Sequence, residues 1–359
     1  MKLAFLHPHN PPDLELHYWR CLVQAEAINR TRRHSARTLS LKDFVLGTEM
    51  AESICGKADI LIIQHDLVAS VLSAVQHWKA RDKTIILDIQ KPLDDMLPGS
   101  PRYQKWIKSL QESEIIPGPQ LDPEGRVQLE WGLKLVDGAT VATEKIEREW
   151  QDHARINYLP VYIPIDSYSN VSRETHPGTV IGWIAGNPPR DIFLGSNALK
   201  ALNQICQAYP SIRVLFADLE EDTFQQTPLP ENQKTLENKV PREGWANLLS
   251  KIDIGVIPKQ SGKSSLSLDI RALEYLVMKT PWISSSPDLS SPLEKYGTVI
   301  DDTAEDWYFR LSNLAVQTPH ARGIPCSGGY LYGISRNIDD RIDDILGSYR
   351  EFMMKPRGF

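Results

Sequence analysis

The sequence predicts an α/β protein built from two doubly wound parallel-sheet domains. Its 359 residues exceed what a single hydrophobic core usually serves. Short apolar runs alternate with segments whose apolar residues recur at helical spacing, and this alternation occurs twice along the chain. Between the two series lies a polar, turn-rich segment, residues 162–177, which we expect to link the domains.

Composition narrows the class of protein. The hydrophobic content of 41% and the charged content of 24% are ordinary for a globular chain. The net charge of −6 argues against a nucleic-acid partner. The widely spaced cysteines predict neither zinc nor a disulfide framework, and so a reduced, cytoplasmic protein: Cys21, Cys55, Cys206 and Cys326. No apolar run approaches the roughly 20 residues of a membrane span, which leaves only peripheral membrane contact open.

The first series of elements begins at the N-terminus. Its candidate strands are residues 3–6, 36–39, 60–64, 84–88, 140–142 and 156–159. Its candidate helices are residues 16–29, 68–79, 103–110, 127–135 and 145–152. Strands that alternate with helices in this way predict a parallel sheet covered on both faces.

The second series repeats the pattern. Its candidate strands are residues 180–184, 213–216, 254–257, 282–284 and 298–300, and its candidate helices are 196–209, 245–250, 268–277 and 306–316. Residues 218–241 are acidic and rich in Pro and Gln, which predicts a surface excursion with little regular structure. After the turn-rich residues 318–332, a final helix over 338–353 carries one apolar face that must be buried.

The segment 252–286 is the most informative part of the chain. An apolar strand runs through a loop of Gly, Lys and Ser, residues 259–267, into a helix. Backbone N–H groups and the positive end of the helix make such a loop an anion site. Lys263, Ser264 and Ser265 are the phosphate candidates, and Gly262 permits close backbone approach. The plainer alternative is an exposed loop that caps the helix.

This segment resembles the donor-binding motif of GT-B glycosyltransferases, especially the retaining family 4 type. The matching residues are Arg271, the Leu-Glu-Tyr of residues 273–275, and the Thr-Pro-Trp-Ile of residues 280–283. Many members of the family carry a first Glu eight positions before the second, where this chain has Leu266. Met278 replaces the usual Gly.

The resemblance extends along most of the chain in the family's order. The matching segments are residues 59–65, 85–96, 135–143, 158–165 and 181–184. The resemblance implies two Rossmann-like domains that face a cleft. Residues 1–163 would form an acceptor domain and residues 164–330 a nucleotide-sugar donor domain, with residues 331–359 packing back on the first domain as a C-terminal helix.

Candidate site residues of the second domain follow from the resemblance. It assigns Glu274 to the donor's ribose hydroxyls, with Arg271 beside the phosphates or holding the Glu. The alternative for this pair is an ordinary surface ion pair. Gly186, Asn187 and Arg190 follow a buried strand, where open α/β sheets bind ligands. Arg190 would stabilise the departing diphosphate, or it is a solvated side chain in a proline-stiffened loop.

In the first domain, His65 ends a strand on the expected cleft side. It would contact sugar or acceptor, or it is a structural histidine. His7 and His9 form a His-x-His pattern without further evident ligands, so we expect no metal. Asp88 and the pair Asp94–Asp95 have no spacing that places two carboxylates across a glycosidic bond. The absence of Gly-x-Gly-x-x-Gly after the first strand weighs against a dinucleotide dehydrogenase.

The resemblance implies a glycosyltransferase that moves a sugar from a nucleotide-sugar, such as a UDP- or GDP-sugar, to an acceptor. Polysaccharide, glycolipid and protein acceptors stay open. It further implies a retaining reaction without metal or cofactor, in which Lys263, Arg190 and helix-end amides stabilise the leaving diphosphate. The alternative is a catalytically degenerate protein that binds nucleotide or serves in assembly, because Leu266 replaces the first Glu.

Overall fold

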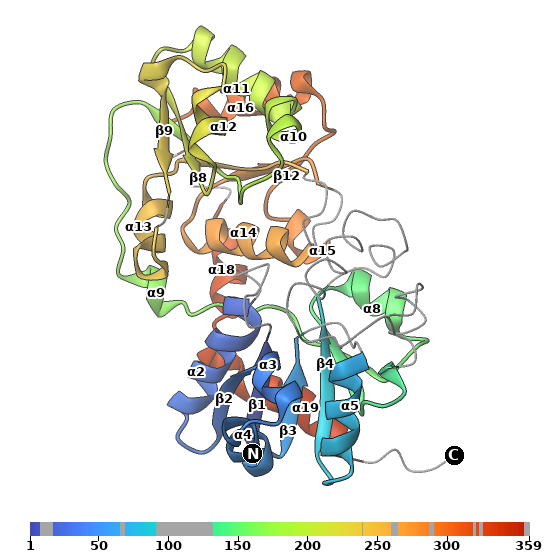
Figure 1. The fold of residues 1–359 in the computed structure, drawn as a ribbon. Coiled ribbons are helices and arrows are strands. Elements are labelled where there is room, and N and C mark those ends of the chain that lie inside the picture. Colours follow the sequence, from blue (N-terminus) through green and yellow to red (C-terminus); the bar gives the residue numbers. More distant parts are fainter. Residues whose placement is uncertain are drawn as a thin grey trace. The chain divides into compact units, whose positions relative to one another are not determined.

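The computed structural model describes residues 1–7, 17–64, 69–90, 132–238, 240–259, 265–286, 291–318, 321–322 and 326–354. The chain divides into two compact units (Figure 1). Met1–Ile163 and Ile338–Phe359 form the first unit, and Pro164–Asn337 form the second. Residues 331–337, which the sequence analysis grouped with the final helix, fall in the second unit.

The first unit is built on a six-stranded parallel sheet in the order β2-β1-β3-β4-β5-β6. The strands are β1 (Lys2–His7), β2 (Ser35–Ser40), β3 (Ile60–Ile63), β4 (Thr84–Ile89), β5 (Gly138–Val141) and β6 (Ile156–Tyr158). Every strand predicted for this unit is present. The strand order reverses between β1 and β3, which makes the carboxyl ends of these strands the switch point of the sheet.

Helices cover the first sheet. Those among the described residues are η1 (Tyr18–Leu22, a π-helix), α2 (Val23–Arg30), α3 (Leu41–Leu46), α4 (Glu49–Lys57), α5 (Ala69–Lys79), α8 (Glu144–Trp150), η5 (Asp339–Arg341) and α19 (Ile342–Met353). Helices α3 and α4 were not predicted from the sequence. Each of these helices begins with a residue type typical of N-caps, which was a sequence signal for its start. The Ser40 side chain accepts a hydrogen bond from the Asp43 N–H, and the Thr48 side chain accepts one from the Ala51 N–H. Predicted helix 103–110 and most of helix 127–135 lie outside the described residues.

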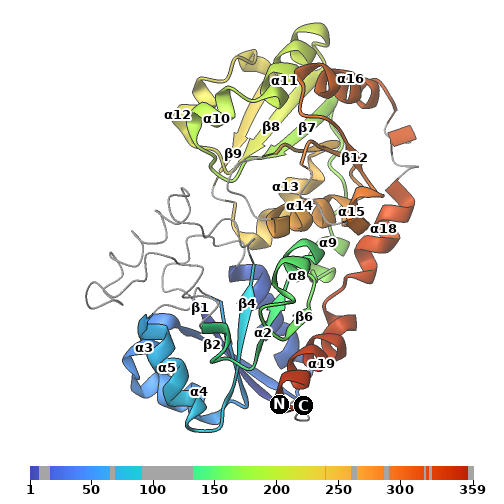
Figure 2. The same cartoon turned by 90° about the vertical axis from the view of Figure 1, so that its right-hand side faces the viewer.

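The C-terminal helix α19 returns to the first unit, as predicted (Figure 2). It buries Ile345, Leu346, Tyr349 and Phe352. The Tyr349 ring lies edge-on to Phe5 of β1 with 6.1 Å between centroids, and its hydroxyl donates to Gln24 Oε1 at 2.8 Å. The helix therefore supplies part of the first unit's core.

The second unit contains a six-stranded parallel sheet in the order β12-β11-β10-β7-β8-β9. The strands are β7 (Thr179–Ile184), β8 (Ile212–Ala217), β9 (Lys234–Glu237), β10 (Ile254–Ile257), β11 (Trp282–Ser284) and β12 (Thr298–Val299). The prediction of an irregular excursion over residues 218–241 was wrong, because β9 lies within it. Strand β9 is a short edge strand whose four residues, Lys-Thr-Leu-Glu, include a single apolar one, so it gives only a weak sequence signal.

The helices described for the second unit are α9 (Asp166–Ser169), α10 (Arg190–Leu194), α11 (Asn197–Ala208), α12 (Glu221–Gln225), η3 (Glu231–Gln233), η4 (Arg242–Gly244), α13 (Trp245–Ser250), α14 (Ser265–Val277), α15 (Ser291–Glu294), α16 (Ala304–Ala315) and α18 (Cys326–Ser335). The sequence predicted α11, α13, α14 and α16 among them. The prediction of a turn-rich segment over residues 318–332 was wrong for its second half, because helix α18 begins at Cys326. Its glycines masked it: Gly329 and Gly333 allow close packing, since a Cβ there would meet Leu276 and Val277 of α14.

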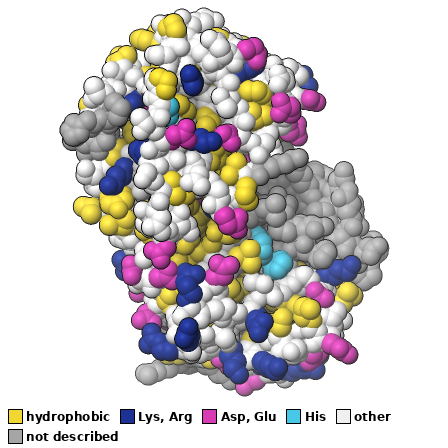
Figure 3. All heavy atoms as spheres, turned by 90° about the vertical axis from the view of Figure 1, so that its left-hand side faces the viewer, with side chains coloured by type: hydrophobic (Ala, Val, Ile, Leu, Met, Phe, Trp, Pro, Cys, Tyr) yellow, Lys and Arg dark blue, Asp and Glu magenta, His cyan; other side chains and the backbone are white. Residues whose placement is uncertain are grey.

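The distribution of charge on the surface and the character of the helices bear on the environment of the protein. On the face drawn in Figure 3, Lys and Arg side chains are interspersed with Asp and Glu, which is the pattern of a solvated surface. Within the described ranges, no helix combines the length and the apolar character needed to cross a membrane.

Candidate functional site

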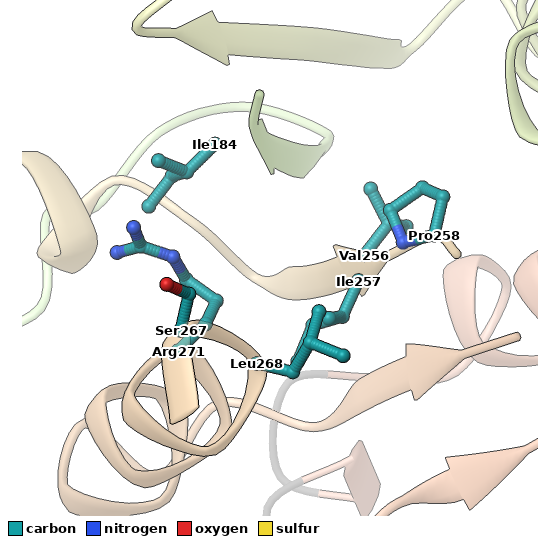
Figure 4. A pocket seen from close by; sticks show the side chains of 7 residues that line it. All are labelled: Ile184, Val256, Ile257, Pro258, Ser267, Leu268 and Arg271. Atoms are coloured by element: carbon teal, nitrogen blue, oxygen red, sulfur yellow. The ribbon is translucent and has the colours of Figure 1, made fainter. Parts of the chain in front are cut away.

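A pocket lies at the switch point of the second sheet. Strand β7 pairs with β10 on one side and with β8 on the other, so the chain winds away from it in both directions. Open α/β sheets bind ligands outside the carboxyl ends of the strands at such a point. The lining residues come from the end of β7, the end of β10 and the start of α14: Ile184, Val256, Ile257, Pro258, Ser267, Leu268 and Arg271 (Figure 4).

The pocket combines apolar walls with one cation. Arg271 is 7% exposed, and Figure 4 shows its guanidinium projecting past Ser267 on the side of Ile184. A charge in such a poorly solvated recess interacts more strongly with an entering anion than it would in water. An anion that reaches this recess would therefore meet Arg271 as its cation.

Glu274 lies behind Arg271 and is fully buried. Its Oε2 is 2.5 Å from Arg271 Nη1, and its Oε1 is 3.1 Å from Arg242 Nη2. The Tyr168 hydroxyl also donates to Oε1, at 2.9 Å. The predicted pairing of Arg271 with Glu274 on one helix face is present, whereas the alternative of a surface ion pair was wrong because both side chains are buried.

The Trp245 ring contacts the guanidinium groups of both Arg242 and Arg271. The guanidinium carbons of Arg242 and Arg271 each lie 5.1 Å from the centre of a Trp245 ring, in the range of a cation–π interaction. We call Tyr168, Arg242, Trp245, Arg271 and Glu274 the Glu274 cluster. It contains two guanidinium groups and one carboxylate, so it carries a net charge of about +1 when all three are ionised.

Sequence reasoning missed three members of the Glu274 cluster. Tyr168 lies on α9 in the segment predicted as a linker, and nothing in its local sequence marks it. Arg242 and Trp245 follow the segment predicted as an excursion. A signal was present for these two, because an Arg three residues before a Trp at a helix start allows the pair to lie on one helix face.

The loop after β7 has an unusual backbone. Gly186 and Asn187 have φ values of +64° and +49°, in the left-handed region that Gly and Asn tolerate best. The Asn187 N–H donates to the Asp218 carbonyl at 2.7 Å. Arg190, at the start of α10, is exposed and donates to the Gln226 side-chain oxygen. None of these three loop residues lines the pocket.

Several predicted site residues lie outside the described residues. These are His65, Gly262, Lys263 and Ser264, and only the backbone of Ser265 is described. Ser265 is the first residue of α14, so the loop predicted to end at residue 267 ends before it. The sequence prediction began this helix late because the pattern Ser-Leu-Ser carries little helix propensity.

The first unit also buries a charged pair at the carboxyl end of its sheet. Arg20 of η1 contacts Asp88 of β4 through Nη2–Oδ1 at 2.5 Å and Nε–Oδ2 at 3.1 Å. Thr140 Oγ1 donates to Oδ1 at 2.8 Å. Burial raises the pKa of Asp88, but the charge and hydrogen bonds of Arg20 outweigh it and hold that pKa below its ordinary value. A carboxylate held ionised in this way is unsuited to act as a general acid.

Two histidines meet between the end of β1 and the start of η1. His7 ends the strand, and His17 precedes the helix. The rings of His7 and His17 are 4.2 Å apart. Burial, and then the charge of His7, lower the pKa of His17 to about 4, so His17 is neutral near pH 7. His9, Asp94 and Asp95 lie outside the described residues. Among the residues the structure does describe, no group of three His, Cys, Asp or Glu side chains is placed to hold a metal ion.

The fold of this chain is similar to that of several solved structures, whereas its sequence matches no known family. No protein-family model matches the sequence, and no curated protein matches it. Sucrose-phosphate synthase from Thermosynechococcus elongatus matches with a TM-score of 0.67 at 10% identity, covering 98% of each chain. Anabaena HepE, solved with UDP and glucose, matches with a TM-score of 0.64 at 9% identity, covering 98% of this chain and 99% of HepE.

A third similar structure widens the range of chemistry found on this fold. It is a putative UDP-N-acetylglucosamine 2-epimerase from Listeria monocytogenes, with a TM-score of 0.57 at 12% identity over 96% of each chain. Identities this low show the fold alone. The chain has the GT-B fold, as the resemblance implied. Each of its two α/β units contains a parallel six-stranded sheet, and β9 is the strand of the second sheet that the sequence did not predict.

Proposed function

We propose that this protein is a glycosyltransferase that moves a sugar from a nucleotide-sugar to an acceptor. One observation carries the proposal. Arg271, more than nine-tenths buried, lines a mostly apolar pocket at the switch point of the second sheet, where a donor's diphosphate and sugar would find a cation and apolar walls. The likeness in fold to a sucrose-phosphate synthase and to HepE, solved with UDP and glucose, supports it.

In this proposal the donor diphosphate meets Arg271 and the amides at the start of α14. Helix N-termini favour phosphate because their first N–H groups lack helical partners. Gly186 and Asn187, which lie in the loop after β7 and do not line the pocket, stay proposed donor contacts, as the strand-end position suggests. The loop residues Gly262, Lys263, Ser264 and Ser265 belong to the same proposed site, as the resemblance implies.

The proposed reaction is retaining and metal-independent, of the family 4 type. Fixed cations would neutralise the leaving diphosphate in place of a metal ion. Lys263 and Arg190 are the proposed cations, and His65 is the proposed contact to sugar or acceptor. A polysaccharide, glycolipid or protein would accept the sugar.

The first test is nucleotide binding. Isothermal titration with UDP, GDP, ADP and their sugar conjugates, in buffer with EDTA, should detect binding of one nucleoside diphosphate. Arg271→Gln should weaken it roughly 10-fold or more, because a charge-assisted hydrogen bond is lost. Arg213→Gln is the matched control, since Arg213 is an exposed arginine on β8 of the same sheet. If the wild-type protein binds none of these nucleotides, the proposed function is wrong.

Product analysis then separates the candidate reactions. Incubation of the bound nucleotide-sugar with an acceptor panel should release the nucleoside diphosphate and attach the sugar to an acceptor, with the anomeric configuration read by NMR. Epimerised sugar would instead favour the chemistry named for the Listeria structure. Binding without any turnover would favour the degenerate binding module.

A further inference from the structure

The position of Glu274 does not suit direct contact with a ribose. Its carboxylate is fully buried, and Glu274 is not among the pocket-lining residues. Arg271, one helical turn earlier on α14, lines the pocket instead. A donor that occupies the pocket therefore reaches Arg271 first, and Glu274 stands behind it.

Both oxygens of Glu274 are already engaged. Oε2 accepts from Arg271, while Oε1 accepts from Arg242 and from the Tyr168 hydroxyl. A ribose hydroxyl could bond Oε1 only by displacing one of these donors. Displacing Arg242 would exchange a charge-assisted hydrogen bond for a neutral one, and displacing Tyr168 would break the hydrogen bond that its buried hydroxyl donates to Glu274. Either exchange is unfavourable.

The same contacts fix the Arg271 guanidinium. Glu274 holds one edge of it at 2.5 Å, and the Trp245 ring lies against its face at 5.1 Å. A planar guanidinium held at an edge and a face loses little rotational freedom when it binds a phosphate. Arg242 pairs with the same carboxylate and contacts the same indole, so the carboxylate does not cancel the positive charge of the cluster.

We infer that Glu274 is a positioning residue: it is the buried counter-ion that orients Arg271 toward the donor's phosphates, and it makes no contact with the donor's ribose. This inference rests on the proposed function. It departs from the role that the resemblance assigns to Glu274, and it adds Arg242 as the source of the surplus charge.

The test compares two ligands that differ only at the ribose. Dissociation constants are measured by titration calorimetry for UDP and for 2′,3′-dideoxy-UDP, with wild-type protein and with Glu274→Gln. The substitution should weaken both ligands by the same factor, roughly 10-fold, because it acts through Arg271 and the phosphates. The inference is overturned if Glu274→Gln weakens UDP alone, or if it tightens both ligands.

Two further variants keep the test decisive. Glu237→Gln removes an ion pair with Lys251, at 2.7 Å, on edge strand β9, and should change neither constant. Tyr168→Phe removes one of the donors to Glu274 Oε1 and should shift the constants for both ligands by the same factor, because no ribose hydroxyl takes its place. Tighter binding of UDP alone by Tyr168→Phe would show that the ribose competes for Oε1, which contradicts the inference even if Glu274→Gln fails to fold.

Different measurements would overturn the proposed function and the role of Glu274. If wild-type protein binds no nucleoside diphosphate, the proposed function and this inference are both wrong. If wild-type protein binds UDP and the loss in Glu274→Gln depends on the ribose hydroxyls, the proposed function stands and only the inference is wrong.

Discussion

The buried charges of this protein come in sets rather than in isolated pairs. Arg20 and Asp88 are joined by Thr140 in the first unit, and Arg271 and Glu274 by Arg242 and Tyr168 in the second. Removing a charge from water is costly unless partners satisfy its remaining hydrogen-bonding capacity. Each set therefore holds its residues in place only while it is complete.

Asp88→Asn tests this at the residue scale. It leaves the Arg20 guanidinium buried beside a neutral amide, so we expect it to lower the free energy of unfolding of the first unit by about 3–5 kcal/mol. Hydrogen exchange followed by mass spectrometry measures this separately for each unit. Asp339→Asn is the control, because the Arg30–Asp339 pair is exposed and should contribute little.

The effect of Asp88→Asn should also depend on pH. The pKa of Asp88 is lowered in the folded protein, so its contribution is present above the ordinary Asp pKa of about 4 and is lost as the pH falls through the folded-state value. The stability difference between wild type and variant should be largest near neutral pH and shrink below about pH 4. A difference that stays constant down to pH 3 would contradict the ionised pair.

At the scale of elements, the contact between α14 and β10 positions the pocket. Strand β10 carries Gly255 where a side chain would collide with the ring of Tyr275 on α14, with an added Cβ only 2.4 Å from it. Tyr275 is buried, and its hydroxyl donates to the Gly182 carbonyl of β7 at 3.3 Å. Helix α14 can therefore pack closely against β7 and β10, because β10 has a glycine and no side chain at position 255.

Gly255→Ala should push α14 away from the sheet. We expect a loss of about 1–3 kcal/mol in the stability of the second unit, together with weaker nucleotide binding, because Arg271 moves with the helix. Chemical unfolding and calorimetric titration measure the two effects. Gly328→Ala in α18 is the control, since its nearest neighbour, the Tyr296 ring, lies at an ordinary 3.9 Å and Ala favours a helix. Equal behaviour of the two variants would disprove the packing argument.

At the scale of the whole molecule, chain order and compact units do not coincide. The first unit contains both ends of the sequence, and α19 completes its core after the chain has formed the second unit. Full burial of each large apolar side chain of α19 contributes roughly 1.5–3 kcal/mol. Together, the buried apolar side chains of α19 contribute an amount comparable with the whole free energy of unfolding of a small domain, which is about 5–15 kcal/mol.

Truncation after Asn337 tests this dependence. The shortened chain should lose protection from hydrogen exchange throughout β1–β6 of the first unit, while the strands of the second unit remain protected. Tyr349→Phe is a milder companion, because it removes only the hydrogen bond to Gln24. Retention of full protection in the first unit of the truncated chain would show that α19 is dispensable.

Much of the fold could be predicted because its signals are local. Continuous apolar runs such as residues 60–63 and 254–257 are what strands covered on both faces require, and they appeared where predicted. The errors fell where local signals are weak. Three of the four residues of edge strand β9 are polar, and α18 carries glycines that serve packing against α14 rather than helix propensity.

At the candidate site, the pairing of Arg271 with Glu274 could be predicted from the sequence, because residues three apart on a helix share a face. The burial of Glu274 and its hydrogen bonds from Tyr168 and Arg242 depend on the folded arrangement of the second unit. Tyr168 lies 106 positions away and Arg242 lies 32 positions away. Such contacts depend on strand order and helix packing, which no local pattern encodes.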